Sequence, residues 1–344
     1  MADPTSESLL ATLYYRNNCR SKGRKLMHPA FSLVFFTSMA GMAQGMVVSL
    51  LVLHLAGDPL PNQFMNYLAF PIILLLLAGG LLASFFHLGH PERAWRAILM
   101  WRTSWLSREV LVMPSFIALT VLAYIYSWYF SAIPNWLWGL LSIFAILLWV
   151  CTAMIYQCIR FIQEWAHPMT MVNFIALGFA SGWFLLMVLF VIWSAWLSGE
   201  AIVTTQNIAG VAGFTAFLLL FSLTLKLWIW KRNRTLKPKS TLQSATGIQQ
   251  TPVRQISMGM MGGSFNTREF FHQQSIFFIA NVRKLAFFGA YIIPVTLLAV
   301  AVSQINLNLI VIAFMVHLLG LMAERWLFFA ESNHPQNLYY QRIA

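Results

Sequence analysis

The stretch 69-AFPIILLLLAGGLLASF-85 decides the fold, because it is an almost unbroken run of apolar residues. A helix needs about 20 mainly apolar residues to cross a bilayer. Strands of a closed membrane barrel would instead alternate between apolar and polar residues, and 72-IILLLLAGGLLA-83 does not alternate. The stretch therefore predicts a membrane-spanning helix.

The rest of the chain has the same character. Its 344 residues are 59% hydrophobic and only 9% charged, whereas soluble domains have about 25% charged residues. Helices satisfy their own backbone hydrogen bonds in lipid, so the sequence predicts an all-α polytopic bundle of eight transmembrane helices. The expected spans lie near residues 29–53, 66–87, 110–131, 136–157, 171–197, 207–230, 285–303 and 306–329.

The basic residues predict the orientation of this bundle. With eight spans, all 22 Lys and Arg residues fall in or beside the segments that share a membrane side with the N-terminus. Positive residues accumulate on the cytoplasmic side of membrane proteins. We therefore expect a multi-pass protein of the bacterial inner membrane with both termini in the cytoplasm. Its expected parts are an N-terminal segment (1–28), helices one to six (29–230), a cytoplasmic loop (231–284), helices seven and eight (285–329) and a cytoplasmic tail (330–344).

Charge and polar residues exclude two classes of function. The net charge is +12, but the basic residues are divided among several short membrane-flanking segments, so anionic lipid contact and topology explain them better than nucleic acid does. A transporter would place polar residues at the membrane midplane in broken helices. Here the charged residues lie towards one face, so neither nucleic acid nor a transported substrate is expected.

Metal-ligating residues are sparse. The chain has three cysteines, too few for a four-iron cluster, which needs about four thiolates. Cys151 and Cys158 are expected to pack as small apolar side chains in a helix interface. A haem b would need two facing histidines, and His317 is expected to pack against another polar group instead. We predict neither haem nor an iron–sulfur cluster in this chain.

An unusual set of ionisable residues separates the second span from the third. His87 is predicted at the end of one span and Glu109 at the start of the next, so both lie at a similar membrane depth. Between them, 94-AWRAILMW-101 is typical of a helix lying in the membrane interface. Reduction of a quinone needs a hydrogen bond to its carbonyl oxygen and a titratable group that relays protons. His87 and Glu109 fit these roles, with Arg108, Ser104 and Ser107 as orienting donors.

Simpler roles for the same residues remain open. Arg108 and Glu109 can pair with each other or with lipid headgroups, and His87 can cap a helix end. Unpaired ionisable groups at the edge of the hydrocarbon cost roughly 2–3 kcal/mol or more each. Pairing and function both explain why such groups are retained, and spacing alone does not decide between them.

These residues also carry a resemblance to a known family. The block 87-HLGHP-91 followed by 104-SWLSRE-109 resembles the membrane anchor subunits of the dimethyl sulfoxide reductase type. Within that family, 261-MGGSFNTREFF-271 and 323-AERWLFFAESNHPQNLYY-340 look like the anchor of cytoplasmic sulfite dehydrogenase. The family's histidine of the quinol site falls on His87 and its acidic residue on Glu109.

The resemblance implies a complex of three subunits. A molybdopterin catalytic subunit and a four-cluster iron–sulfur subunit would sit on this anchor, which exchanges electrons with ubiquinone or menaquinone and holds no haem. We expect 93–102 and 258–274 to dock the iron–sulfur subunit on the cytoplasmic side. The segment 232–274 departs from the shorter enteric anchors. A basic, cytoplasmic face favours oxidation of cytosolic sulfite; the alternative is a quinol-oxidising anchor of a reductase for an S- or N-oxide.

Overall fold

The computed structural model describes residues 31–86, 88, 90–130, 132–197, 205–237, 241–249 and 274–333. Every regular element in these ranges is helical. The described residues contain eight helices that are long and apolar enough to cross a membrane, which confirms the predicted all-α bundle. In chain order the spans are α2 (Phe31–Leu55), α3 to α4 (Asn62–Phe64, Met65–Ala69 and Phe70–Phe85), α5 (Trp105–Tyr129), α6 (Asn135–Gln157), α7 (Pro168–Ile192, continued by Trp193–Leu197), α8 (Thr205–Thr235), α11 to α12 (Ile276–Phe287, Phe288–Ile292 and Ile293–Gln304) and α13 (Leu307–Ala330).

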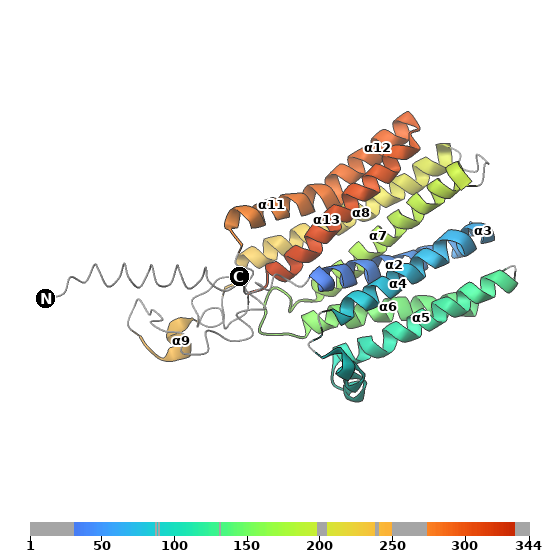
Figure 1. Ribbon diagram of the computed structural model, residues 1–344. Helices are drawn as coiled ribbons and strands as arrows, with labels where there is room; N and C mark the ends of the chain where they lie inside the picture. The colour runs from blue at the N-terminus through green and yellow to red at the C-terminus, as the bar shows by residue number, and fades with distance from the viewer. Residues whose placement is uncertain are drawn as a thin grey trace, which may run out of the picture.

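The spans run side by side and divide into two groups around α2 and α7 (Figure 1). On one side α2 packs on α4 and α6, and α5 packs on α6. On the other side α7 packs on α8, while α13 packs on α11 and α12. Contact between α2 and α7 joins the two groups into one bundle.

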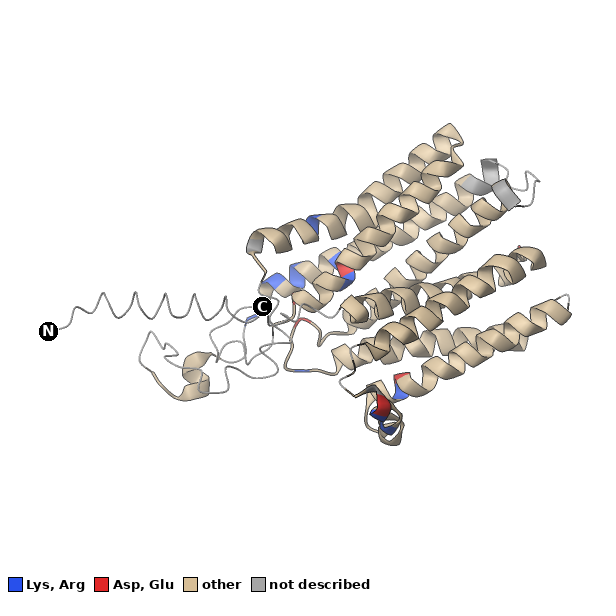
Figure 2. Ribbon diagram, viewed as in Figure 1, with Lys and Arg blue, Asp and Glu red and all other residues tan. Residues whose placement is uncertain are grey.

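Charged side chains gather at one end of the bundle, which we call the basic end. The beginnings of α2, α5, α7 and α11 meet the ends of α4, α6, α8 and α13 there (Figure 1). The described Lys and Arg residues lie towards this end (Figure 2). The connection between α4 and α5 also lies there and contains a 3₁₀ helix, Pro91–Met100, so the expected helix in this connection is present.

Two spans begin at least five residues earlier than hydropathy predicts. The third was expected from residue 110, but α5 begins at Trp105, because Ser104 caps it and accepts a hydrogen bond from Ser107 N. The seventh was expected from residue 285, but its helix begins at Ile276. Arg283 lies inside that helix and pairs with Glu331 on the chain after α13, at 2.7 Å between Nη2 and Oε1. The charge of Arg283, which interrupts the apolar pattern, is therefore paired and does not end the helix.

The contact between α2 and α7 depends on glycine pairs spaced four residues apart, Gly41 with Gly45 and Gly178 with Gly182. A Cβ added at Gly45 would lie 2.9 Å from Gly182 Cα and nearer still to the carbonyl oxygen of Gly178. Small residues at this spacing let helix backbones approach closely in membranes, where packing rather than the hydrophobic effect drives association. The two halves of the bundle are thus joined backbone to backbone.

Candidate functional site

Glu109 lies one turn inside α5 and is almost completely buried, with 6% of its surface exposed. It lies inside the helix because α5 begins at Trp105, before the apolar run that starts at residue 110. Ser107 is also buried, at 3% exposure. Ser104, Ser107, Arg108 and Glu109, which the sequence analysis singled out, all belong to the capped start of α5.

The partner of Glu109 is on the neighbouring helix. Thr152 of α6 is buried, and its hydroxyl donates a short hydrogen bond to Glu109 Oε1. Sequence reasoning missed Thr152, because a threonine within an apolar span more often bonds to its own helix than to another residue. Glu109 is in no ion pair among the described residues. A buried carboxyl of this kind can hold or release a proton without breaking an ion pair.

Arg108 points away from Glu109 and holds the connection between α4 and α5. Its Nε donates to the carbonyl oxygen of Trp101 at 3.0 Å and its Nη2 to that of Arg102 at 2.8 Å. Its guanidinium lies over the ring of Trp105, 4.2 Å from the centroid. The alternative in which Arg108 and Glu109 neutralise each other is therefore wrong for this structure, and Arg108 fixes the local backbone instead.

His87 lies outside the described residues, so its predicted hydrogen bond to a quinone stays a prediction. Its neighbour Phe86 ends α4 and is 76% exposed. Apolar side chains of the connection are exposed as well, among them Trp95, Leu99 and Trp101. The basic end of α4 and α5 thus presents aromatic and apolar surface beside the buried carboxyl. Segment 258–273, expected to take part in docking, is outside the described residues too.

The structure also contains a buried ionic cluster, which sequence reasoning missed. Lys226 of α8 lies 2.8 Å from Glu324 of α13, measured from Nζ to Oε1. Arg325 Nε is 3.5 Å from the other oxygen of Glu324, and Asn173 Nδ2 of α7 donates to Oε1 at 3.4 Å. The guanidinium of Arg325 lies 4.1 Å from the ring centroid of Phe174. Lys226, Glu324 and Arg325 are at most 2% exposed, so two of the basic residues that the sequence assigns to the membrane face are inside the bundle.

His317 and the cysteines give one confirmation and one correction. His317 is fully buried, with Nδ1 2.7 Å from the carbonyl oxygen of Ala290 and Nε2 2.9 Å from Ser181 Oγ. This confirms the expectation that it packs against polar groups. Cys151 is buried as expected, but Cys158 is exposed at the end of α6, so the prediction for Cys158 was wrong. Among the described residues no group of three or more His, Cys, Asp and Glu could hold a metal ion.

Comparison with known proteins identifies the family. Residues 27–330 match the family described as DMSO reductase anchor subunit (DmsC). The chain belongs to this family. It is therefore a membrane anchor subunit of an oxidoreductase complex of the molybdoenzyme kind. The chain is also 43% identical over 335 residues to a subunit of sulfite dehydrogenase from Allochromatium vinosum, an alignment that covers 92% of this chain and 100% of that protein. The family resemblance read from 87-HLGHP-91 and 104-SWLSRE-109 is thereby confirmed.

Proposed function

We propose that this anchor subunit reduces membrane quinone with electrons from the oxidation of sulfite in the cytoplasm. The observation that carries the proposal is the buried Glu109, which is hydrogen-bonded by Thr152 and forms no ion pair among the described residues. The similarity to a sulfite dehydrogenase of another bacterium supports the choice of sulfite. The alternative, quinol oxidation for an S- or N-oxide reductase, agrees with the family description.

The chemistry requires proton transfer beside the quinone. A quinone takes up two electrons and two protons to become a quinol, and each proton is added to one of its carbonyl oxygens. Glu109 carries protons between the bound quinone and water at the basic end, and Thr152 orients its carboxyl. His87 donates a hydrogen bond to a quinone carbonyl. Arg108 and Ser104 keep the first turn of α5 and the preceding connection in place.

The partner subunits dock at the basic end in this proposal. A four-cluster iron–sulfur subunit passes electrons to the quinone, and a molybdopterin subunit oxidises sulfite. The helix Pro91–Met100 offers a docking surface, because it exposes Trp95 together with Arg93 and Arg96 beside the Glu109 site. Both termini then lie in the cytoplasm, as the distribution of the 22 basic residues predicts. A periplasmic reporter that is active when fused to Ala344 would contradict this orientation.

The first test replaces the proton carrier. Glu109→Gln keeps the shape of the side chain and its hydrogen bond to Thr152 but removes the exchangeable proton. A positioned acid–base group typically contributes about 100-fold or more to a rate, so quinone-linked turnover of the assembled complex should fall about 100-fold. Turnover with a soluble artificial acceptor should stay unchanged, because those electrons leave before they reach the anchor. His87→Leu should behave in the same way.

Asp58→Asn is the matched control, because Asp58 is an exposed carboxylate in the chain between α2 and α3, away from the proposed quinone site and docking surface. It should leave quinone-linked turnover unchanged. If Glu109→Gln also keeps wild-type turnover, the quinone site is elsewhere. A separate measurement decides the substrate: sulfite added to the oxidised complex should reduce its clusters, whereas oxidation of the reduced complex by dimethyl sulfoxide would favour the alternative.

A further inference from the structure

One face of α8 is exposed from the middle of the helix to its basic end. Its residues recur every three or four positions, so they form one continuous stripe along the helix. We call it the outer stripe of α8, and its members are Phe217, Leu220, Thr224, Leu227, Lys231 and Arg234. On the opposite face Leu219, Ser222 and Lys226 are buried against the bundle. The outer stripe therefore faces away from the bundle, towards the surrounding lipid.

The outer stripe changes from apolar to basic where the lipid headgroups are expected to begin. Trp228 lies beside Leu227 and is 42% exposed, and tryptophan rings of spanning helices are enriched at the interface between membrane and water. Lys231 and Arg234 follow Trp228 within two turns, and both are exposed. Residues three apart on a helix have Cβ atoms about 5–6 Å apart. A single phosphate group can therefore contact both cations.

The neighbouring helix α11 adds a third cation to this surface. Glu331 joins the two helices, because Trp230 Nε1 of α8 donates to one of its oxygens at 3.1 Å and Arg283 of α11 donates to the other. Lys284 follows Arg283 and is exposed, while Phe288, one turn further from the basic end, is 47% exposed. On α11, as on α8, an exposed aromatic residue is thus followed by an exposed cation towards the basic end.

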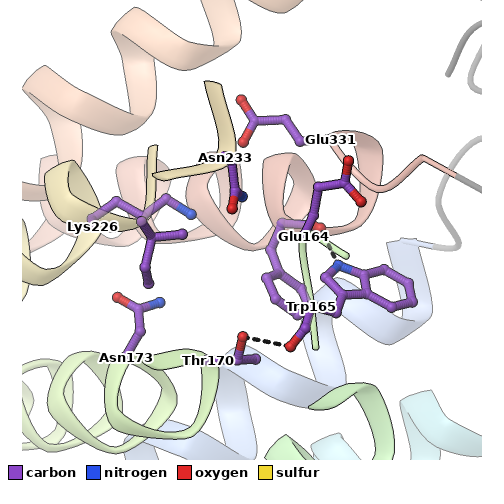
Figure 3. A pocket seen from close by; sticks show the side chains of 9 residues that line it. Glu164, Trp165, Thr170, Asn173, Lys226, Asn233 and Glu331 are labelled. Atoms are coloured by element: carbon purple, nitrogen blue, oxygen red, sulfur yellow. Dashed lines mark hydrogen bonds between the residues drawn. The ribbon is translucent and has the colours of Figure 1, made fainter. Parts of the chain in front are cut away.

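The three exposed cations have no carboxylate partner in the part of the chain that the structure describes. Lys231, Arg234 and Lys284 take part in none of its ion pairs. By contrast, Lys226 on the inner face of α8 pairs with Glu324 and lines a small polar cavity inside the bundle (Figure 3). Lysine and arginine can lay their apolar stems along hydrocarbon and keep their charged ends at the headgroup level. The anion suited to these cations therefore comes from the lipid.

We propose that Lys231, Arg234 and Lys284 form a binding site for one anionic phospholipid in the leaflet at the basic end. Their charged groups donate hydrogen bonds to the headgroup phosphate, and the acyl chains lie along the outer stripe of α8 and against Phe288. Clusters of basic residues beside spanning helices recognise anionic headgroups in this way. The site depends neither on a quinone near Glu109 nor on the direction of electron transfer.

Native mass spectrometry of the purified complex in detergent tests the chemistry of the ligand. Phosphatidylglycerol is the probe, and phosphatidylcholine, whose headgroup has no net charge, is the comparison. Each nearby Lys or Arg strengthens the binding of an anionic lipid about fivefold. The first phosphatidylglycerol molecule should therefore bind the wild type about tenfold or more tightly than phosphatidylcholine does. Glycerol phosphate, which has no acyl chains, should not displace it at the same concentration. Displacement would indicate a site for free phosphate groups and would overturn the proposal.

Arg234→Gln tests the position of the site, and Arg160→Gln is its matched control. Arg160 is also an exposed arginine, but it lies in the chain after α6. Affinity for phosphatidylglycerol should fall about fivefold in Arg234→Gln and about 25-fold in the double variant Lys231→Gln/Arg234→Gln. It should stay unchanged in Arg160→Gln, and affinity for phosphatidylcholine should not change in any variant. Wild-type affinity for phosphatidylglycerol in the double variant would contradict the proposal.

The double variant also distinguishes a lipid from a protein partner. We expect it to retain its partner subunits in wild-type proportion, because the proposed docking surface is the helix Pro91–Met100, in the connection between α4 and α5. If Lys231 and Arg234 instead docked an acidic subunit, the double variant would release that subunit from the membrane. Such a release, measured by co-purification, would show that this surface binds protein and not lipid.

Discussion

Gly45→Ala should weaken the contact between α2 and α7 severely for so small a change. The added methyl group would lie 2.9 Å from Gly182 Cα and closer to the carbonyl oxygen of Gly178, whereas carbon atoms pack best at about 3.5–4.0 Å. The two backbones must therefore separate by about 0.6 Å or more. A gap of about 0.5–1 Å already removes a quarter to a half of the dispersion energy between facing atoms. Overpacking typically costs about 1–3 kcal/mol, and we expect the upper part of this range, because backbone atoms cannot move aside.

Gly139→Ala is the matched control, since a Cβ at Gly139 of α6 would meet nothing within 4 Å. In a helix this replacement is neutral or stabilising by up to about 1 kcal/mol. The assay is unfolding of the purified anchor in mixed micelles by titration with dodecyl sulfate, followed by far-ultraviolet circular dichroism. The two variants should differ by about 3 kcal/mol in the free energy of unfolding. If they agree within about 0.5 kcal/mol, the glycine contact does not hold the two halves of the bundle together.

Two further predictions concern one buried carboxyl and one partly exposed carboxyl. Glu324→Gln should lower the free energy of unfolding by about 3–5 kcal/mol, because it leaves Lys226 and Arg325 buried without their shared anion; the same micelle titration measures this, and a loss under about 1 kcal/mol would contradict it. Glu164 has a folded-state pKa raised above its ordinary value of 4.5 by burial, so the stability it contributes is complete below pH 4.5 and is lost as the pH rises through the folded pKa. Glu164→Gln should therefore make the thermal unfolding midpoint of the complex fall less above pH 4.5 than it does in the wild type, and an equal fall in both proteins would refute this.

The fold was predictable because the thickness of the bilayer fixes how many consecutive apolar residues a spanning helix needs. Each span needs about 20 apolar residues, and eight such stretches are visible without any structure. The helix starts were less predictable. Hydropathy treats Arg108 and Arg283 as breaks, but the first bonds to backbone carbonyl groups and the second pairs with Glu331. A helix can continue beyond its apolar stretch where its charged side chains have hydrogen-bond or ion-pair partners.

The candidate site was predictable only in part. Glu109 stands out in sequence as an acidic residue at the edge of an apolar run, and its burial follows from the helix that begins at Trp105. Thr152 could not be found in this way, because threonines within spans are frequent and their bonding depends on which helices are neighbours. The cluster of Lys226 and Glu324 was missed for a similar reason. Its members are far apart in sequence, and each alone is typical of a residue at a helix end.

The two buried carboxyls of the basic end are held in opposite ways, and this difference separates their functions. Glu109 is bonded to a neutral hydroxyl and forms no ion pair among the described residues, whereas Glu324 has two cations beside it. A carboxyl without a cation can change its charge without breaking an ion pair, which agrees with the role of proton carrier that we propose for Glu109. A carboxyl between two cations is part of a buried ion pair that joins α8 to α13, so Glu324 has a structural role in the bundle.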